Sequence, residues 1–217
     1  MGNDRVPEAS GPLGRPVPSP PVADDVPADR FTVREALREL SRLDLAVYRA
    51  VASTSTPALD APLRRLSNAA NRSLIWVVAA GALAAVGGRR GRRAAMAGLT
   101  SVVVTSATVN LGLKHLYARE RPDRTEAGVT DARHTSMPES SSFPSGHSAS
   151  GFAFATAVGR EIPALALPLR MLAAAVAYSR VHSGVHYPGD AIIGSLAGGA
   201  LGLAVGARFS WHAAAPS

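Results

Sequence analysis

Lys114 is the only lysine among the 23 lysine and arginine residues of this 217-residue chain. It opens the first of three short polar motifs, which are Lys114-x6-Arg121-Pro122, Pro144-Ser145-Gly146-His147 and Ser179-Arg180-x5-His186-x3-Asp190. Together the motifs contain three cations, two imidazoles, two serine hydroxyl groups and a carboxylate. A set of this kind can bind a phosphoryl group and break its ester bond.

The three cations suit a phosphate ester. The transition state of phosphoryl transfer spreads negative charge over the phosphate oxygens, so catalysis depends on positioning and electrostatic stabilisation. Arg121 and Arg180 each present a planar fork of N–H donors, whereas Lys114 supplies a compact point charge. An apolar helix is expected to begin near Gly146, so the backbone N–H groups of residues 146–148 should point at the anion. Gly146 has no side chain to block that approach.

The two motif histidines suggest a division of labour between a nucleophile and a general acid. Asp190 follows His186 by four residues, and Pro188 suits the first turn of a helix that starts between them. The carboxylate is therefore expected to face Nδ1 of His186 and to orient the ring. We predict His186 as the nucleophile and His147 as the acid that later activates water. His182, in the same loop, is predicted to be structural.

Composition excludes several other classes of site. The chain has no cysteine, which excludes thiolate metal sites, disulfides and cysteine nucleophiles. The formal charge is +7, but the arginines are not interleaved with aromatic residues, so a nucleic-acid partner is not expected. A divalent ion would be repelled by three required cations. We therefore expect neither a metal nor another cofactor.

The motifs lie at the ends of apolar segments, which define the expected architecture. Five segments are poor in charge, at residues 73–86, 94–113, 148–158, 162–179 and 191–207. They predict an all-α integral membrane bundle with about five spanning helices. A soluble bundle is the alternative, because several segments are short and rich in alanine.

The chain before these segments has a different character. Residues 1–30 are rich in proline and predict a disordered tail. Residues 31–72 predict amphipathic interfacial helices, the first over 32–52 with a capping box formed by Thr32 and Glu35. The membrane phosphatase domain is then expected at 73–208, and a C-terminal tail at 209–217.

Arginine distribution predicts the orientation in the membrane. Four arginines between the first two apolar segments, Arg89, Arg90, Arg92 and Arg93, mark a cytoplasmic loop. Alternation then puts all three motifs on the extracytoplasmic face of a multi-pass protein of the cell membrane. In the last segment, Gly194, Gly198, Gly202 and Gly206 share one helix face. This stripe favours close packing inside the bundle over a dimer contact, and the oligomeric state stays open.

The three motifs resemble those of the type 2 phosphatidic acid phosphatase family, whose phosphoryl-binding fold is shared with vanadium haloperoxidases. The resemblance covers about residues 73–207, and the chain is similar to short actinobacterial members of the family. It implies a helical bundle, metal-independent hydrolysis and a covalent phosphohistidine intermediate. It also implies a nucleophile at His186, its orienting partner at Asp190, a general acid at His147, and phosphate contacts from Lys114, Arg121, Ser145, Gly146 and Arg180.

The expected protein is thus a membrane-bound hydrolase that removes phosphate from a lipid phosphate or diphosphate. Polyprenyl diphosphate, phosphatidic acid, phosphatidylglycerol phosphate and a polyprenyl-phosphoryl sugar phosphate all fit. The resemblance also implies a narrower hypothesis, because some short actinobacterial relatives are linked to dephosphorylation of decaprenylphosphoryl-phosphoribose in cell-wall synthesis. Vanadate-dependent halide oxidation and non-catalytic phospholipid binding at the membrane are two competing hypotheses of different classes.

Overall fold

The computed structural model describes residues 32–214, so the expected proline-rich tail at 1–30 lies outside the described residues. The described chain is helical and contains no strand, which confirms the all-α class. Its main helices are α1 (Val33–Ser53), α2 (Pro57–Ala69), α3 (Leu74–Val86), α4 (Gly88–Ala107), α6 (Gly146–Glu161), α7 (Ala166–His182) and α8 (Pro188–Ala214). Shorter turns are η1 (Asn71–Ser73), η2 (Thr108–Leu113), α5 (Lys114–Leu116), η3 (Asp131–Arg133) and η4 (Pro163–Leu165).

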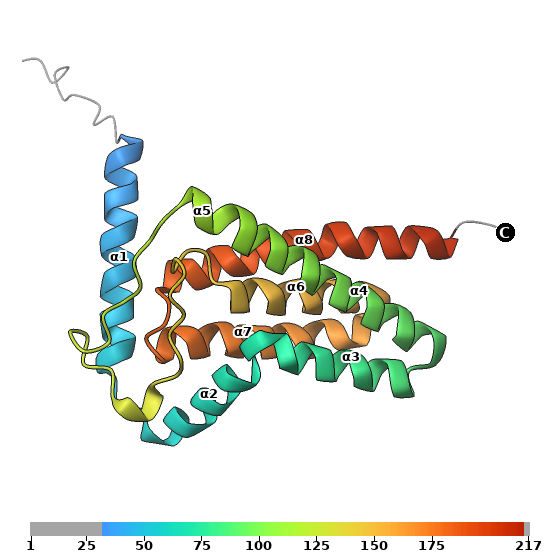
Figure 1. Ribbon diagram of the computed structural model, residues 1–217, viewed down its shortest axis with the longest axis horizontal. Coiled ribbons are helices and arrows are strands. Elements are labelled where there is room, and N and C mark those ends of the chain that lie inside the picture. The colour runs from blue at the N-terminus through green and yellow to red at the C-terminus, as the bar shows by residue number, and fades with distance from the viewer. Residues whose placement is uncertain (1–31, 215–217) are drawn as a thin grey trace, which may run out of the picture.

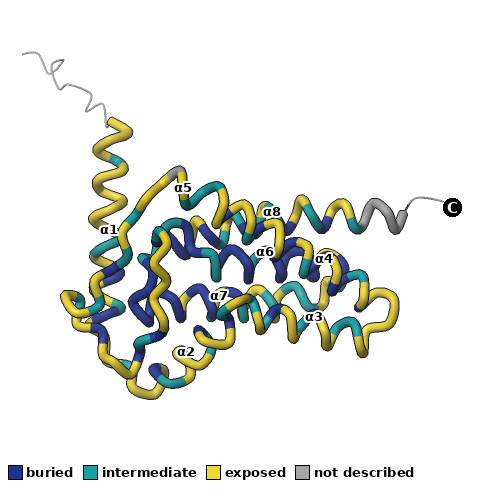
Figure 2. The backbone as a smooth tube through the Cα atoms, viewed as in Figure 1, coloured by how far each residue is buried: buried dark blue, intermediate teal, exposed yellow. Residues whose placement is uncertain are grey.

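Helix α6 is the centre of the bundle and is buried along most of its length (Figures 1 and 2). It packs against α4, α7 and α8. Its sequence is mostly Gly, Ala and Ser, and such small side chains let neighbouring helix backbones approach closely. The N-terminus of α6 therefore lies deep at one end of the bundle, where it presents Gly146 and His147.

The glycine stripe of α8 lies against α6. A Cβ atom at Gly194, Gly198 or Gly202 would lie 2.5, 2.0 and 2.5 Å from backbone carbonyl oxygens at the cap of α6 and along it. Because real Cβ atoms do not approach that closely, only glycine permits this helix crossing. The interpretation that the stripe packs inside the bundle is confirmed.

Fewer than five helices of the described residues are long and apolar enough to cross a membrane. Among the described residues, the ranges Gly88–Leu113, Pro163–His182 and Pro188–Phe209 are long and apolar enough to span, and α2 with α3 makes a fourth span if they count as one bent segment. The segments at 73–86 and 148–158 form helices of 13 and 16 residues. Those are shorter than the roughly 20 residues that cross a bilayer. The count of about five is therefore not confirmed, and α8 continues to Ala214 beyond the expected boundary at 208.

The amphipathic N-terminal helices are present as expected. Helix α1 begins with the capping box of Thr32 and Glu35, and apolar side chains along it are exposed, among them Leu37, Leu40 and Leu43. It stands beside one end of the bundle at a steep angle to the other helices (Figure 1). It contacts α7 and α8.

Arg89, Arg90, Arg92 and Arg93 lie in the first turns of α4 and not in the expected loop, at the end of the bundle opposite the motifs. Arg90 Nε donates to the backbone oxygen of Glu161 at 2.6 Å, and Arg93 Nε donates to its carboxylate at 2.5 Å. Glu161 ends α6. The arginines and the three motifs are thus separated by the length of α6.

Candidate active site

All three motifs meet at the end of the bundle that lies beside α1 (Figure 1). Lys114 follows the π-helical end of the long α4 segment, and Arg121 lies in the loop after it. The second motif forms the N-cap and first residues of α6. The third motif spans the last turn of α7, the tight turn that follows, and the first turn of α8, with Arg180, His186 and Asp190 in that order.

His186 is buried, and its Nδ1 atom lies 3.6 Å from Asp190 Oδ2. Helix α8 begins at Pro188, so the four-residue spacing brings the carboxylate back over the ring. Ser142 donates its hydroxyl to Asp190 Oδ2 and lies 3.5 Å from His186 Nδ1. The backbone N–H of Tyr187 donates to the same carboxylate oxygen at 2.9 Å. Asp190 is therefore held by several donors, and Nε2 of His186 is left to face Arg121.

Burial lowers the pKa of His186 to about 4, and the positive charges of Arg121 and Arg180 also lower it. The nearby carboxylate of Asp190 opposes this effect but does not overcome it. A histidine with a pKa near 4 is neutral at physiological pH and keeps a free lone pair. That is the protonation state a nucleophilic imidazole needs.

Arg121 is fixed beside the Nε2 edge of that ring. Its Nη1 donates to the carbonyl oxygen of Val185 at 3.0 Å and lies 3.4 Å from His186 Nε2. Its Nε donates to the carbonyl oxygen of Ser140 at 3.0 Å. Burial lowers the pKa of Arg121, yet an arginine stays charged in proteins. A phosphoryl group on Nε2 would meet this guanidinium directly.

Arg180 is the deepest cation of the site and is 0% exposed. Its Nη1 donates to Ser67 Oγ at 2.6 Å, but its Nε and Nη2 have no hydrogen-bond partner among the described residues. A buried N–H without an acceptor costs free energy, more so when it carries charge. The two unpaired donors are suited to a bound oxyanion such as phosphate.

Lys114 stands at the outer edge of the site. Its Nζ donates to Ser140 Oγ at 3.1 Å, and the side chain is half-buried. Burial lowers the pKa of Lys114, and the neighbouring charge of Arg121 lowers it further. One ammonium therefore joins the two guanidinium groups around the same space.

Lys114→Arg is expected to reduce kcat on the order of 10- to 1000-fold, as removing one transition-state donor does. The charge is kept, but a planar fork replaces a point charge beside Ser140, whose carbonyl already accepts from Arg121. The purified variant would be compared with Lys114→Gln, which removes the charge. Near-normal turnover by Lys114→Arg would show that the lone lysine is incidental.

The second motif begins helix α6. Ser145 is the N-cap, and its Oγ accepts hydrogen bonds from the backbone N–H and the hydroxyl of Ser148, at 3.4 and 3.0 Å. A Cβ at Gly146 would meet only the Val109 side chain, at 3.9 Å. The start of the helix is thus open to close approach by an anion, which helix N-termini favour.

His147 is oriented by a residue far away in the sequence. Its Nε2 lies 3.1 Å from Asn71 Oδ1. Asn71 stands at the break between α2 and α3, where Arg72 and Ser73 adopt left-handed conformations with φ of 52° and 59°. Non-glycine residues rarely adopt such angles. The break, with a bend of 63° between the helices, brings Asn71 to the site.

Sequence reasoning missed the side chains that support these groups. Ser67, Asn71 and Ser142 belong to no motif, and their contacts join positions 113, 76 and 48 residues apart. No local pattern identifies such pairs. His182, in contrast, makes protein contacts of the kind expected for a structural residue, because its Nε2 lies 3.0 Å from Thr56 Oγ1 and 3.3 Å from Asp60.

The fold and the site together define a helical membrane protein with a phosphoryl-binding centre. The chain matches the model of the PAP2 superfamily over residues 94–213. It is 36% identical to decaprenylphosphoryl-5-phosphoribose phosphatase of Mycobacterium tuberculosis over 171 residues, which are 76% of this chain and 88% of that protein. The protein of the same name from Mycolicibacterium smegmatis is 36% identical over 144 residues, 64% of this chain and 72% of that one.

Two solved structures share the fold. LpxE of Aquifex aeolicus has a TM-score of 0.58 and 22% identity, covering 75% of this chain and 94% of its own. The transmembrane PAP2 type phosphatidylglycerolphosphate phosphatase of Bacillus subtilis has a TM-score of 0.56 and 20% identity, covering 81% and 86%. The chain belongs to the PAP2 superfamily and is a membrane phosphatase of that family.

Proposed function

We propose that this phosphatase removes the terminal phosphate of a polyprenyl-phosphoryl sugar phosphate by transferring it to His186 Nε2. The observation that carries the phosphoryl-transfer assignment is Arg180, a fully buried guanidinium with two N–H groups that have no partner among the described residues. The substrate class follows the name of the mycobacterial relatives, which match most of this chain. Polyprenyl diphosphate and phosphatidic acid present the same phosphate chemistry and are the substrates to compare.

Two chemical steps account for the hydrolysis. Burial and the neighbouring Arg180 lower the pKa of His147 to about 2, so its ring takes up a proton when the phosphate dianion binds and offsets the surrounding cations. In the first step, the Nε2 lone pair of His186 attacks phosphorus, a P–N bond forms, and the P–O bond to the lipid part breaks as protonated His147 donates that proton to the departing oxygen. Asp190 stabilises the positive charge that develops on the ring of His186. In the second step His147 takes a proton from water, the water oxygen attacks phosphorus, and the P–N bond breaks. Inorganic phosphate leaves and both rings return to their starting states.

The phosphate oxygens are assigned to the three cations and to the start of α6. Arg180 and Arg121 bind through their guanidinium forks and Lys114 through its ammonium. Ser145 and Gly146 complete the cradle at the helix N-terminus. These groups supply the positive charge that the transition state requires, so the proposed reaction uses no metal or other cofactor.

Phosphate release from a panel of lipids tests the assignment. Purified protein in detergent would be given a polyprenyl-phosphoryl ribose phosphate, a polyprenyl diphosphate and phosphatidic acid, each with excess chelator. We expect release without added metal and the highest kcat/KM for the phosphosugar lipid. A preference for phosphatidic acid would contradict the proposed substrate. No release from any lipid would favour non-catalytic phospholipid binding.

We also propose that the site faces away from the cytoplasm, at the cell membrane. The support is the arginine-rich start of α4, which lies at the opposite end of the bundle and carries the positive charge typical of the cytoplasmic side of a membrane protein. This orientation places the phosphate centre at the outer leaflet. The domain limits at 31–72 and 73–208 belong to the same proposal, with the amphipathic helices lying along the membrane surface.

A cysteine at Thr130 is expected to react with an impermeant thiol reagent in intact cells, because the chain has no other cysteine and Thr130 is exposed at the site end. The matched control is Val86→Cys, which is exposed at the end of α3 beside the arginine-rich start of α4 and leaves every arginine in place. Val86→Cys should react only after lysis. The reverse pattern would place the substrate in the inner leaflet.

A further inference from the structure

Arg119 lies between two carboxylates at the site but belongs to none of the motifs. Its Nη1 donates to Asp190 Oδ1 and its Nη2 to Asp44 Oδ2, both at 2.7 Å. The guanidinium carbon lies 4.0 Å from the ring centre of Tyr187, whose backbone N–H donates to Asp190. Arg119 is thus occupied by protein contacts on both sides. It joins the carboxylate that orients His186 to a carboxylate on α1.

Asp44 also contacts the backbone of the first turn of α8, which carries Asp190. Its Oδ1 accepts a hydrogen bond from the backbone N–H of Gly189 at 2.7 Å, directly before Asp190. A Cβ at Gly189 would lie 3.0 Å from Asp44 Oδ2, so a larger residue would crowd the carboxylate. A carboxylate here also complements the positive N-terminal end of α8. One side chain therefore binds both Arg119 and the backbone that carries Asp190.

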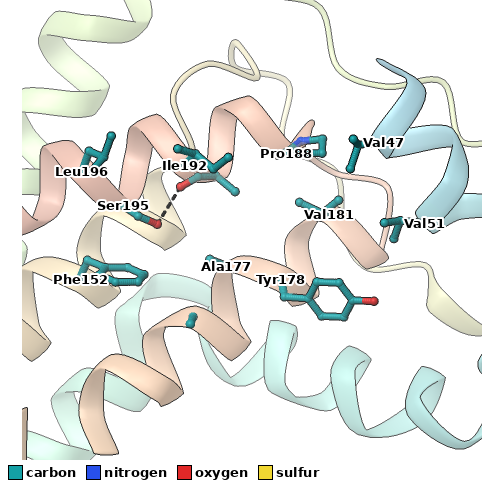
Figure 3. Close-up of a pocket in the computed structure, with 12 residues that line it drawn as sticks. Val47, Val51, Phe152, Ala177, Tyr178, Val181, Pro188, Ile192, Ser195 and Leu196 are labelled. Atoms are coloured by element: carbon teal, nitrogen blue, oxygen red, sulfur yellow. Dashed lines mark hydrogen bonds between the residues drawn. The ribbon is translucent and has the colours of Figure 1, made fainter. Parts of the chain in front are cut away.

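Helix α1 contacts Tyr187 and the first turn of α8 through Asp44 and the neighbouring Tyr48. Tyr48 is buried, and its ring lies edge-on to Tyr187 at 5.4 Å between centres. Farther along, residues of α1, α7 and α8 line an apolar pocket of about 440 Å³, with Val47 and Val51 at one end (Figure 3). A buried apolar cluster also joins Tyr48 and Ala52 of α1 to Val181 and Ala191, and the polar contacts of Asp44 add to this packing directly beside Asp190.

We propose that Asp44 is a positioning residue for catalysis, holding Asp190 against His186 through Arg119 and the backbone N–H of Gly189. The inference rests on the role of Asp190 proposed above. Asp44 lies outside residues 94–213, which match the family, so α1 would supply part of the working site from beyond that range. Burial alone would lower the pKa of Arg119, but its bonds to Asp44 and the charge of Asp190 outweigh burial, so the pKa is raised. Arg119 therefore stays charged and keeps both partners.

Asp44→Asn is expected to lower kcat on the order of 10-fold while KM changes little, because small misplacements of a catalytic group reduce the chemical step. His186 is faced by Arg121, Arg180, His147 and Asp190. Asp44 reaches this set through Arg119, and removing its negative charge leaves the Arg119 cation beside Asp190 less neutralised, which disfavours the imidazolium form. The pKa of His186 then falls, and the acidic limb of the kcat/KM profile moves to lower pH.

The control is Glu126→Gln, which removes a different ion pair of α1, the exposed contact with Arg49 at 3.3 Å. It should leave kcat and the pH profile unchanged. Arg119→Gln completes a double-mutant cycle with Asp44→Asn, and the double variant should lose little more than the worse single variant. If the two substitutions lowered kcat independently, so that their factors multiplied in the double variant, Asp44 would not act through Arg119.

Asp190→Asn separates this inference from the proposed function. If Asp190→Asn keeps turnover, the mechanism proposed above fails. If Asp190→Asn is inactive but Asp44→Asn has wild-type kcat and pH profile, only the positioning role fails. Should Asp44→Asn not fold, Gly189→Ala crowds the same carboxylate without removing a charge. A lowered kcat in Gly189→Ala would support the inference, and a wild-type kcat would overturn it.

Discussion

His186→Ala is expected to abolish turnover, by a factor on the order of 10⁴ or more, as loss of a nucleophile does in other covalent enzymes. His186 is buried beside Asp190 and Arg121, and its Nε2 is the ring atom facing the cations. His147 cannot replace it, because its ring is held by Asn71 at the start of α6. Steady-state phosphate release by the purified variant is the measurement. Retained turnover would rule out the nucleophile assignment.

His147→Ala is expected to slow turnover without preventing phosphoryl transfer to His186, unlike His186→Ala. Without the proton donor, transfer to His186 should continue slowly from a substrate whose leaving group needs no proton, such as a nitrophenyl phosphate. Acid-labile phosphate should then accumulate on the protein, since water activation is also slowed. His182→Gln is the matched control, because His182 lies in the same region but bonds to Thr56 and Asp60 instead. It should show near-normal turnover.

Gly198→Leu is expected to lower both stability and activity. A Cβ at Gly198 would lie 2.0 Å from a backbone oxygen of α6, so the two helices must separate. Overpacking of this kind costs on the order of 3 kcal/mol, which corresponds to roughly 6 to 12 °C in Tm for a chain of this length. Activity falls as well because the backbone N–H of Ser145 donates to the backbone oxygen of Asp190 at 3.0 Å, across the same helix crossing.

The adjacent Gly199 provides the control for that prediction. A Cβ at Gly199 would meet nothing within 4 Å, so Gly199→Ala should raise Tm slightly through its higher helix propensity. Melting in detergent and turnover on a lipid phosphate would be measured for both variants. Unaltered melting and turnover in Gly198→Leu would mean that the glycine stripe of α8 does not determine how α8 packs against α6.

The sequence by itself determined the chemistry and the class of protein. Phosphoryl transfer restricts which residue types can serve, so an isolated Lys114 and an ordered set of Arg, His and Asp are informative without coordinates. The His186–Asp190 arrangement is also local, because a helix that begins at Pro188 brings the two side chains together over four residues. Apolar segments likewise predicted an all-α membrane bundle, since burial in lipid requires helices whose backbone groups are internally paired.

The tertiary structure alone decided which residues support the site. Asn71 reaches His147 through a sharp break between α2 and α3, and no periodicity predicts a break held by two left-handed residues. Asp44 reaches Asp190 by way of Arg119 and the backbone of Gly189 in the first turn of α8. The burial of α6 also depends on packing, because this short helix is enclosed by α4, α7 and α8 rather than exposed to lipid along its length. Local patterns report the groups that chemistry demands, whereas the partners that orient those groups depend on how distant helices meet.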